Sequence, residues 1–403
     1  MQKVQSKDSK NWLVFMLYTR NEHDECLRVI EEILKETNNR NDVASYVKGL
    51  ILRSRGEILQ SLEIFKWSQK LNPVSMEIVK QVGRCLHLIG RSKSAIDVYE
   101  QALKLSPDDW EIWHCKGMCH THRNELDEAL ECFHSANLIQ KHDVTFIQQG
   151  EILVRKEDYK SAIDVYLEAL EFSPENPELL TTLGLLYLRL SENLKSFQYL
   201  GNALTLDPIN TKALLATGSI IQDRSDHDAA LLKYRIIAVY NPNSAQLWNN
   251  IAMCFFGKGK YVATIACLKK AQYLDPFEWI IPYNLGIAHL STQQFASAFH
   301  YFNAAISLNA YFASSYMYLA LALSNLGDIE NACAAYEKAI SLEEDFLIYL
   351  NYAITLNNYG QKEKAREIFL KFKELFDKLD AVSRELDPDI QSRSRSLQAS
   401  LDQ

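Results

Sequence analysis

The sequence predicts an all-α fold, a solenoid of antiparallel helix pairs stacked one after another. The first observation is compositional: 14 Gly and 9 Pro in 403 residues leave few turns for a sheet-rich fold, and strong helix formers dominate the periodic segments. The second is a small residue that recurs every 34 residues, with two steps of 33. The third is a pair of further columns that keep the same phase.

The three columns define ten repeating units. The small residues of the first column are Gly49, Gly83, Gly117, Gly150, Gly184, Gly218, Ala252, Gly286, Ala320 and Ala353. The second column lies 12 residues later and is Ser61, Ala95, Ala129, Ala162, Ser196, Ala230, Thr264, Ala298, Ala332 and Ala365. An aromatic residue or Leu follows after 4 more, at Phe65, Tyr99, Phe133, Tyr166, Leu200, Tyr234, Leu268, Phe302, Tyr336 and Phe369.

This pattern is that of the tetratricopeptide repeat, two antiparallel helices per unit, and it predicts a superhelical solenoid. Small side chains in the first two columns allow the two helices of a unit to approach closely. Glycines at 56, 90, 259, 327 and 360 lie seven residues after the first column. The first helix must end there, and a left-handed cap is easiest for Gly.

The predicted organisation has four parts. Residues 1–10 are polar and are expected to form a mobile arm, and residues 11–41 a degenerate capping helix pair that lacks the small-residue column. The ten repeats occupy residues 42–379. Past Leu379 the periodicity fades, so residues 380–403, which include the run Ser392-Arg393-Ser394-Arg395-Ser396, are expected to form a frayed tail.

Charge and cysteine usage narrow the classes of partner. A net charge of -8 argues against broad binding to nucleic acid or anionic membranes, which requires excess Lys and Arg. No apolar run approaches the roughly 18 to 20 residues of a membrane span. The 8 cysteines fall inside apolar helical patterns, unlike the framework of a secreted disulfide protein. We therefore expect a cytosolic protein with reduced thiols.

The sequence offers little for catalysis or cofactors. It contains no GxGxxG or GxxxxGK[ST] match, and a repeat array has no central pocket formed by converging loops. The unit at 110–143 contains a group of Cys and His residues that makes zinc conceivable: His114, Cys115, Cys119, His120, His122, Cys132 and His134. Paired CxxC spacing is missing, however, and free Cys is a common buried hydrophobe. We expect no enzyme activity, no cofactor and no metal site.

The concave surface of such an array, lined by the first helices, is where partners are expected to bind. Asn250, Asn284 and Asn351 occupy the sixth position of their units, beside Asn249 and Tyr283. An Asn amide can donate to a peptide carbonyl and accept from a peptide N–H, so these residues are the candidate partner groove. The alternative is that Asn is simply frequent at this repeat position.

A carboxylate clamp of the chaperone-tail type is not expected. That clamp pairs Lys at the fifth position with Asn at the ninth, but here Lys80 is followed by Arg84. Lys80, Arg155 and Arg189 remain as local basic spots or as solvated surface.

Several strings resemble one family in particular, the Bardet-Biedl syndrome 4 subunits. They are SPENPELLTTLGLLYL (173–188), LGNALT (200–205), LWNNIAMCFFGKGKYVA (247–263) and QFASAFH (294–300), and the repeat consensus alone does not dictate a run such as CFFGK. The resemblance extends from about residue 11 to about residue 375.

The resemblance implies a non-enzymatic subunit of the BBSome, a coat-like adaptor that moves membrane-protein cargo into and out of cilia. It implies as partners a second tetratricopeptide subunit, a propeller-bearing subunit and a small extended subunit in the concave face, with centriolar-satellite and dynein-linked proteins as further associates. The implied locations are the cytoplasm, the cilium, its basal body and centriolar satellites. The open alternatives are a free-standing adaptor or co-chaperone and, less favoured, the repeat half of a glycosyltransferase-like enzyme.

Overall fold

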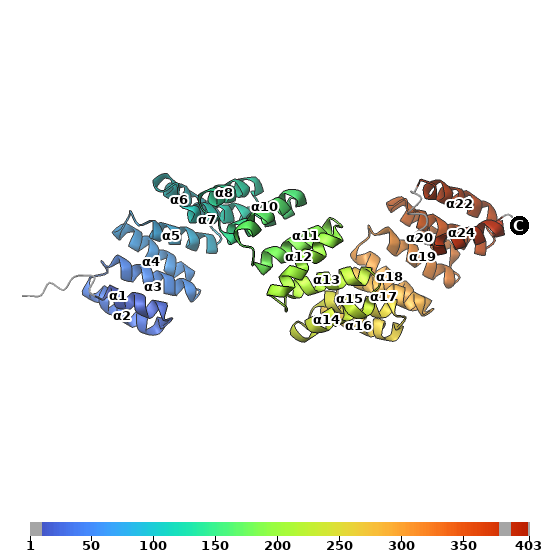
Figure 1. Cartoon of the computed structure of the whole chain (residues 1–403), viewed down its shortest axis with the longest axis horizontal. Coiled ribbons are helices and arrows are strands. Elements are labelled where there is room, and N and C mark those ends of the chain that lie inside the picture. The colour runs from blue at the N-terminus through green and yellow to red at the C-terminus, as the bar shows by residue number, and fades with distance from the viewer. Residues whose placement is uncertain (1–9, 379–387, 402–403) are drawn as a thin grey trace, which may run out of the picture. The chain divides into compact units, whose positions relative to one another are not determined.

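A computed structural model describes residues 10–378 and 388–401, and the described residues form helices joined by short turns, with no strand among them. The predicted all-α fold is thereby confirmed. The chain divides into two compact units, residues 1–190 and 191–403, and each is described by itself (Figure 1).

The first unit contains a short pair followed by longer pairs: α1 (Asn11–Thr19), α2 (His23–Glu36), α3 (Asp42–Ser54), α4 (Ile58–Leu71), α5 (Met76–Leu88), α6 (Ser92–Leu105), α7 (Trp110–His122), α8 (Leu126–Ile139), α9 (Asp143–Arg155), α10 (Tyr159–Phe172) and α11 (Pro177–Arg189). The second unit contains α12 (Asn193–Leu206), α13 (Thr211–Asp223), α14 (His227–Tyr240), α15 (Ala245–Gly257), α16 (Tyr261–Leu274), α17 (Ile280–Ser291), α18 (Phe295–Leu308), α19 (Ala313–Asn325), α20 (Ile329–Leu342), α21 (Phe346–Asn358), α22 (Lys362–Phe376) and α24 (Pro388–Leu401).

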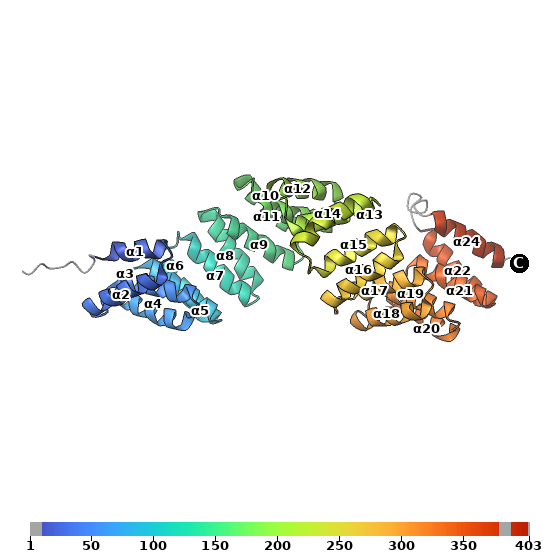
Figure 2. The ribbon, with the colours of Figure 1, turned by 90° about the horizontal axis from the view of Figure 1, so that it is seen from below.

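Within each unit the helices pack in chain order, each against the next (Figure 2). The first helices of neighbouring pairs also contact one another: α5 meets α7, and α13, α15, α17, α19 and α21 form a contiguous series. We call the surface that these first helices form within each unit the A-helix surface of that unit. It brings side chains from successive repeats within reach of one another.

The first column lies where the two helices of a pair are closest. A Cβ atom placed on Gly150 would lie 2.3 Å from the Tyr166 ring, and one placed on Gly218 would lie 2.4 Å from Tyr234. Both tyrosines are almost fully buried. The aromatic ring of the second helix therefore fills the volume that a side chain on the first helix would need.

A left-handed residue follows the first helix of every predicted repeat. The five glycines predicted as caps have φ between 68° and 86°, which confirms that prediction. The other five repeats adopt the same conformation without glycine, at Asn124, Glu157, Ser191, Ser225 and Gln293, with φ between 60° and 63°. In the repeat of Glu157, the N–H of Asp158 donates to the carbonyl of Leu153 at 3.0 Å, which closes the helix end.

The N-terminal end carries the helix pair α1 and α2. Val14 of α1 and Cys26 and Ile30 of α2 are fully buried in one cluster with residues of α3. Residues 1–9 of the predicted mobile arm lie outside the described residues.

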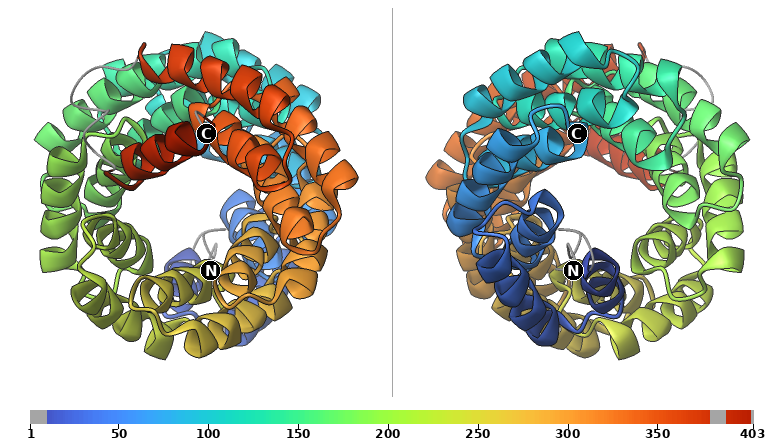
Figure 3. Two further views of the ribbon diagram at one scale, coloured as in Figure 1. Left: turned by 90° about the vertical axis from the view of Figure 1, so that its right-hand side faces the viewer. Right: turned by 90° about the vertical axis from the view of Figure 1, so that its left-hand side faces the viewer.

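The C-terminal end differs from the predicted frayed tail. Residues 379–387 lie outside the described residues, but residues 388–401 form helix α24, which contacts α21 and α22 (dark red in Figure 3). Ile390, Leu397 and Leu401 are at most 8% exposed and join the last core cluster. Their spacing of seven and four places them on one helix face, a short signal that the 34-residue period does not contain.

Candidate protein-binding surface

The asparagines of α15 and α17 meet on the A-helix surface. The Nδ2 group of Asn284 donates to Oδ1 of Asn249 at 2.8 Å, and Nδ2 of Asn249 lies 3.4 Å from Oδ1 of Asn250. All three side chains are partly buried and come from adjacent repeats. They form a chain of amides that bridges two repeats while part of each residue still faces solvent.

Tyr283, the residue before Asn284 in α17, lies within a group of aromatic rings. Its ring centroid lies 5.2 Å from that of Phe312, 5.9 Å from Tyr318 and 6.1 Å from Phe302, each in an edge-on arrangement. Burial, with a smaller contribution from Tyr318, raises the pKa of Tyr283, so its hydroxyl is neutral. These ring contacts hold the side chain of Tyr283 in one orientation.

Asn351 lies apart from the other two asparagines. Its Oδ1 accepts a hydrogen bond from Arg393 of α24 at 2.5 Å, and its Nδ2 lies 3.3 Å from Sδ of Met317. The structure thus brings together Asn249, Asn250 and Asn284, whereas Tyr283 contacts aromatic rings of the following repeat and Asn351 contacts helix α24. A peptide would have to displace Arg393 to reach Asn351.

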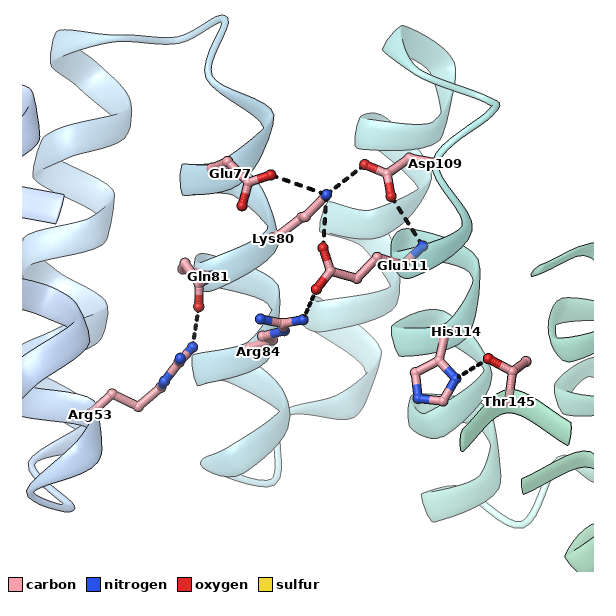
Figure 4. A network of polar contacts seen from close by, with 9 residues as sticks. All are labelled: Arg53, Glu77, Lys80, Gln81, Arg84, Asp109, Glu111, His114 and Thr145. Carbon is pink, nitrogen blue, oxygen red and sulfur yellow. Dashed lines mark hydrogen bonds and ion pairs between the residues drawn. The ribbon is translucent and has the colours of Figure 1, made fainter. Parts of the chain in front are cut away.

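A second polar cluster, which the sequence analysis missed, joins α5 to α7 (Figure 4). Lys80 is only 7% exposed. Its Nζ lies 2.6 Å from Asp109, 2.8 Å from Glu111 and 3.2 Å from Glu77. Arg84 also pairs with Glu111. Lys80 is therefore neither a free basic spot nor a clamp residue, because three carboxylates of its own chain surround it.

Electrostatics within this cluster keep its members charged. Burial disfavours the charged form of Glu111, but the hydrogen bond from Lys80 and the positive charge of Arg84 outweigh it, so the pKa of Glu111 is lowered. Burial opposes the charge of Lys80 as well, yet hydrogen bonds to Asp109 and Glu111 raise the pKa of Lys80. In the sequence, this cluster is indicated only by the acidic residues Asp109 and Glu111, which lie about one repeat after Lys80.

The Cys/His-rich helix α7 spreads its donors among different partners. His114 Nδ1 lies 3.1 Å from Thr145 Oγ1, and Cys119 Sγ lies 3.3 Å from His87 Nδ1. Burial raises the pKa of Cys119 to about 12 and that of Cys132 to about 11, so both thiols are protonated. Over residues 10–378 and 388–401, no three His, Cys, Asp or Glu side chains are grouped so that they could bind a metal ion.

Among the helices that the structure describes, none combines the length and the apolar character needed to cross a bilayer.

Sequence profiles described as tetratricopeptide repeat match residues 46–109, 98–131, 245–278 and 313–346, and one described as TPR repeat matches 150–191. The BBSome complex member BBS4 of Bos taurus is 46% identical over 399 residues, which covers 98% of this chain and 76% of the relative. The Mus musculus protein of that name is 47% identical, covering 89% and 69%. The Drosophila melanogaster BBS4 homolog is 33% identical, covering 92% and 80%.

Two solved structures share the fold at low sequence identity. The APC/C hetero-tetramer Cut9-Hcn1 matches with a TM-score of 0.50 and 12% identity over 98% of this chain and 96% of that chain. A monomeric mutant of IFIT1 with Gppp-AAAA matches with a TM-score of 0.54 and 16% identity over 80% of each chain. At these identities the likeness concerns the arrangement of helix pairs alone.

Proposed function

This chain belongs to the BBS4 family of BBSome complex members, and from that premise we propose that it is a non-enzymatic scaffold subunit of a BBSome. The observation that carries the proposal is 46% identity across 98% of a chain built from tetratricopeptide repeats. Stacked helix pairs present long surfaces to other polypeptides. The chain would contribute such a surface to a coat-like assembly for ciliary membrane-protein trafficking.

The partners we propose are other BBSome subunits: a second tetratricopeptide subunit, a propeller-bearing subunit and a small extended subunit. Centriolar-satellite and dynein-linked proteins are further candidates, with the cytoplasm, the cilium and its basal body as locations. The extended subunit suits the A-helix surface, because side chains there come from consecutive repeats at regular intervals. A bound strand would meet a new set of side chains at each helix.

The proposed contact residues for that strand are Asn249, Asn250, Asn284 and Tyr283. The asparagine amides would exchange hydrogen bonds with the strand's backbone, and the ring of Tyr283 would pack against its side chains. Each hydrogen bond between an asparagine amide and the strand contributes on the order of 0.5–1.5 kcal/mol net. We propose Asn351 as a contact only for a partner that first displaces α24, given its bond from Arg393.

Affinity purification of the full chain from ciliated cells, followed by size exclusion, tests the proposal. A scaffold subunit should elute in a large complex with other BBSome subunits. Elution near monomer or dimer size without them would instead favour a free-standing adaptor or co-chaperone and would refute the proposal.

A set of variants tests the contact residues. Replacing Asn249, Asn250 and Asn284 by Ala should weaken co-purification of the small extended subunit at least tenfold while helicity stays constant. Asn202→Ala on the exposed face of α12 is the matched control. Equal recovery of the small subunit with the triple variant and the control would exclude these asparagines as contacts.

A further inference from the structure

A pocket of about 300 Å³ lies on the A-helix surface of the first unit. Its walls come from α3, α5, α6 and α7. They include the guanidinium groups of Arg53 and Arg84, the rings of His87 and His114, and the apolar side chains of Leu88 and Met118. A volume of this size accepts one or two side chains of a peptide and is small for most cofactors.

We propose that this pocket binds a carboxylate of an extended partner peptide, with Arg53 and Arg84 holding the carboxylate and Leu88 and Met118 contacting the apolar residue next to it. This deepens the proposed function, because it names one chemical group of the partner that would lie on the A-helix surface. It differs from the chaperone-tail clamp, since Lys80 is already surrounded by carboxylates of the same chain.

The charges around the pocket favour an anion. No Asp or Glu lines it, and the carboxylates of Glu77, Asp109 and Glu111 gather on the Lys80 side of the network (Figure 4). Within the described part of the chain Arg53 has no carboxylate partner, since Nη1 donates to the neutral amide of Gln81. The guanidinium at the mouth thus keeps an uncompensated positive charge.

The arginines also keep donors for a ligand. A guanidinium carries five N–H groups in a planar fork that fits a carboxylate. Gln81 occupies one nitrogen of Arg53, and Glu111 accepts from one terminal nitrogen of Arg84. Arg84 also interacts with Cys115 in the pocket wall, so the guanidinium with the most open donors is that of Arg53.

The histidines of the wall do not add charge at neutral pH. Burial, together with the neighbouring His122, lowers the pKa of His87. Burial, with smaller effects from His142 and Arg84, lowers the pKa of His114 to about 4. Both rings are neutral near pH 7, so the anion is recognised by the two arginines, and the rest of the wall is suited to an apolar neighbour.

Selection from a displayed library of random 12-residue peptides, made with the full chain, tests the proposal. Wild-type protein should enrich peptides with Asp, Glu or a free C-terminus next to an apolar residue. Arg53→Gln should lower the affinity of a selected synthetic peptide at least tenfold, and Met118→Glu should also weaken it, because it removes an apolar contact and adds a charge that repels the carboxylate. Arg91→Gln is the matched control, because Arg91 is exposed and lies outside the pocket lining.

Two chemical changes in the selected peptide identify the source of the carboxylate. Loss of binding on amidation of the C-terminus assigns the terminal carboxylate, and loss on Glu→Gln or Asp→Asn assigns a side chain. Circular dichroism of Arg53→Gln checks folding, and Arg53→Lys supplies a second charged variant with weaker fork geometry. Selected peptides without carboxylate enrichment, or binding unaffected by Arg53→Gln and Met118→Glu, would overturn the proposal even if the chain assembles into a BBSome.

Discussion

Substitution of Gly150 by Ala tests whether the close approach of the two helices in a pair sets the stability of a repeat. The added Cβ would lie 2.3 Å from Cζ of Tyr166 and within 2.7 Å of both Cε atoms, whereas ordinary contacts begin at 3.4 Å. The ring would have to move by about 1 Å, and it is only 1% exposed. Tyr166 also donates a hydrogen bond to the carbonyl of Ile147 at 3.3 Å, which the movement would strain.

The expected magnitude follows from two opposing effects. Inserting a methyl group into a packed core costs about 1–3 kcal/mol. Replacing Gly by Ala within a helix returns about 0.5–1 kcal/mol. The net expectation for Gly150→Ala is a loss of up to about 2.5 kcal/mol in the free energy of unfolding.

Gly201 in α12 provides the matched control, because a Cβ there would meet nothing within 4 Å. Gly201→Ala should therefore stabilise the protein by about 0.5–1 kcal/mol. Urea unfolding followed by circular dichroism gives the midpoints, and hydrogen exchange of α9 and α10 localises the effect, since long repeat arrays need not unfold in two states. The steric reasoning is refuted if Gly150→Ala stabilises the protein as Gly201→Ala does. A Tyr166→Leu change should relieve the clash in a double-mutant cycle.

Three other perturbations have defined outcomes. Gln293→Gly should raise the free energy of unfolding by about 0.5–1 kcal/mol, because a non-glycine residue in the left-handed conformation costs more than the added chain entropy of Gly; an unchanged or lower midpoint in urea would contradict this. Glu111→Gln should lower the free energy of unfolding at pH 7 by only about 1 kcal/mol, because solvent screens a partly exposed ion pair. Because the pKa of Glu111 is lowered in the folded state, this difference is present above about pH 4.5 and disappears as the pH falls through the folded pKa; thermal unfolding from pH 7 to 3 measures it, and a pH-independent difference would count against the ion pair. Arg393→Ala should accelerate hydrogen exchange in α24 with no change in α13, since it removes the bond to Asn351; equal exchange in both proteins would mean that the bond does not hold the helix.

The repeat architecture was predictable because its causes are local and recur. A small residue in one helix and an aromatic ring in the next, as in Gly150 and Tyr166, meet within a single repeat. The same contact therefore recurs at the same spacing along the sequence. The left-handed residue at the end of the first helix could be predicted from the sequence only in the repeats where that residue is glycine. Glu157 and Gln293 adopt the same φ because the helix end, fixed by its neighbours in the repeat, imposes it.

The polar features were less predictable because their partners lie in other repeats. Lys80 meets Asp109 and Glu111 only after two successive first helices have packed side by side, and no spacing rule specifies which charges then face one another. The contact of Asn351 with Arg393 spans 42 residues and depends on α24, which lies outside the period. The proposed contacts of Asn250 and Asn284 with a partner remain predictions.

Helix α24 determines which apolar surface a truncated chain would expose. Each helix pair of a repeat array has an apolar face on which the next pair packs. The terminal pair would therefore leave such a face exposed to solvent. Ile390, Leu397 and Leu401 of α24 cover that face beside α21 and α22. A protein truncated before residue 388 would expose this apolar face, which should favour self-association and removal by cellular quality control.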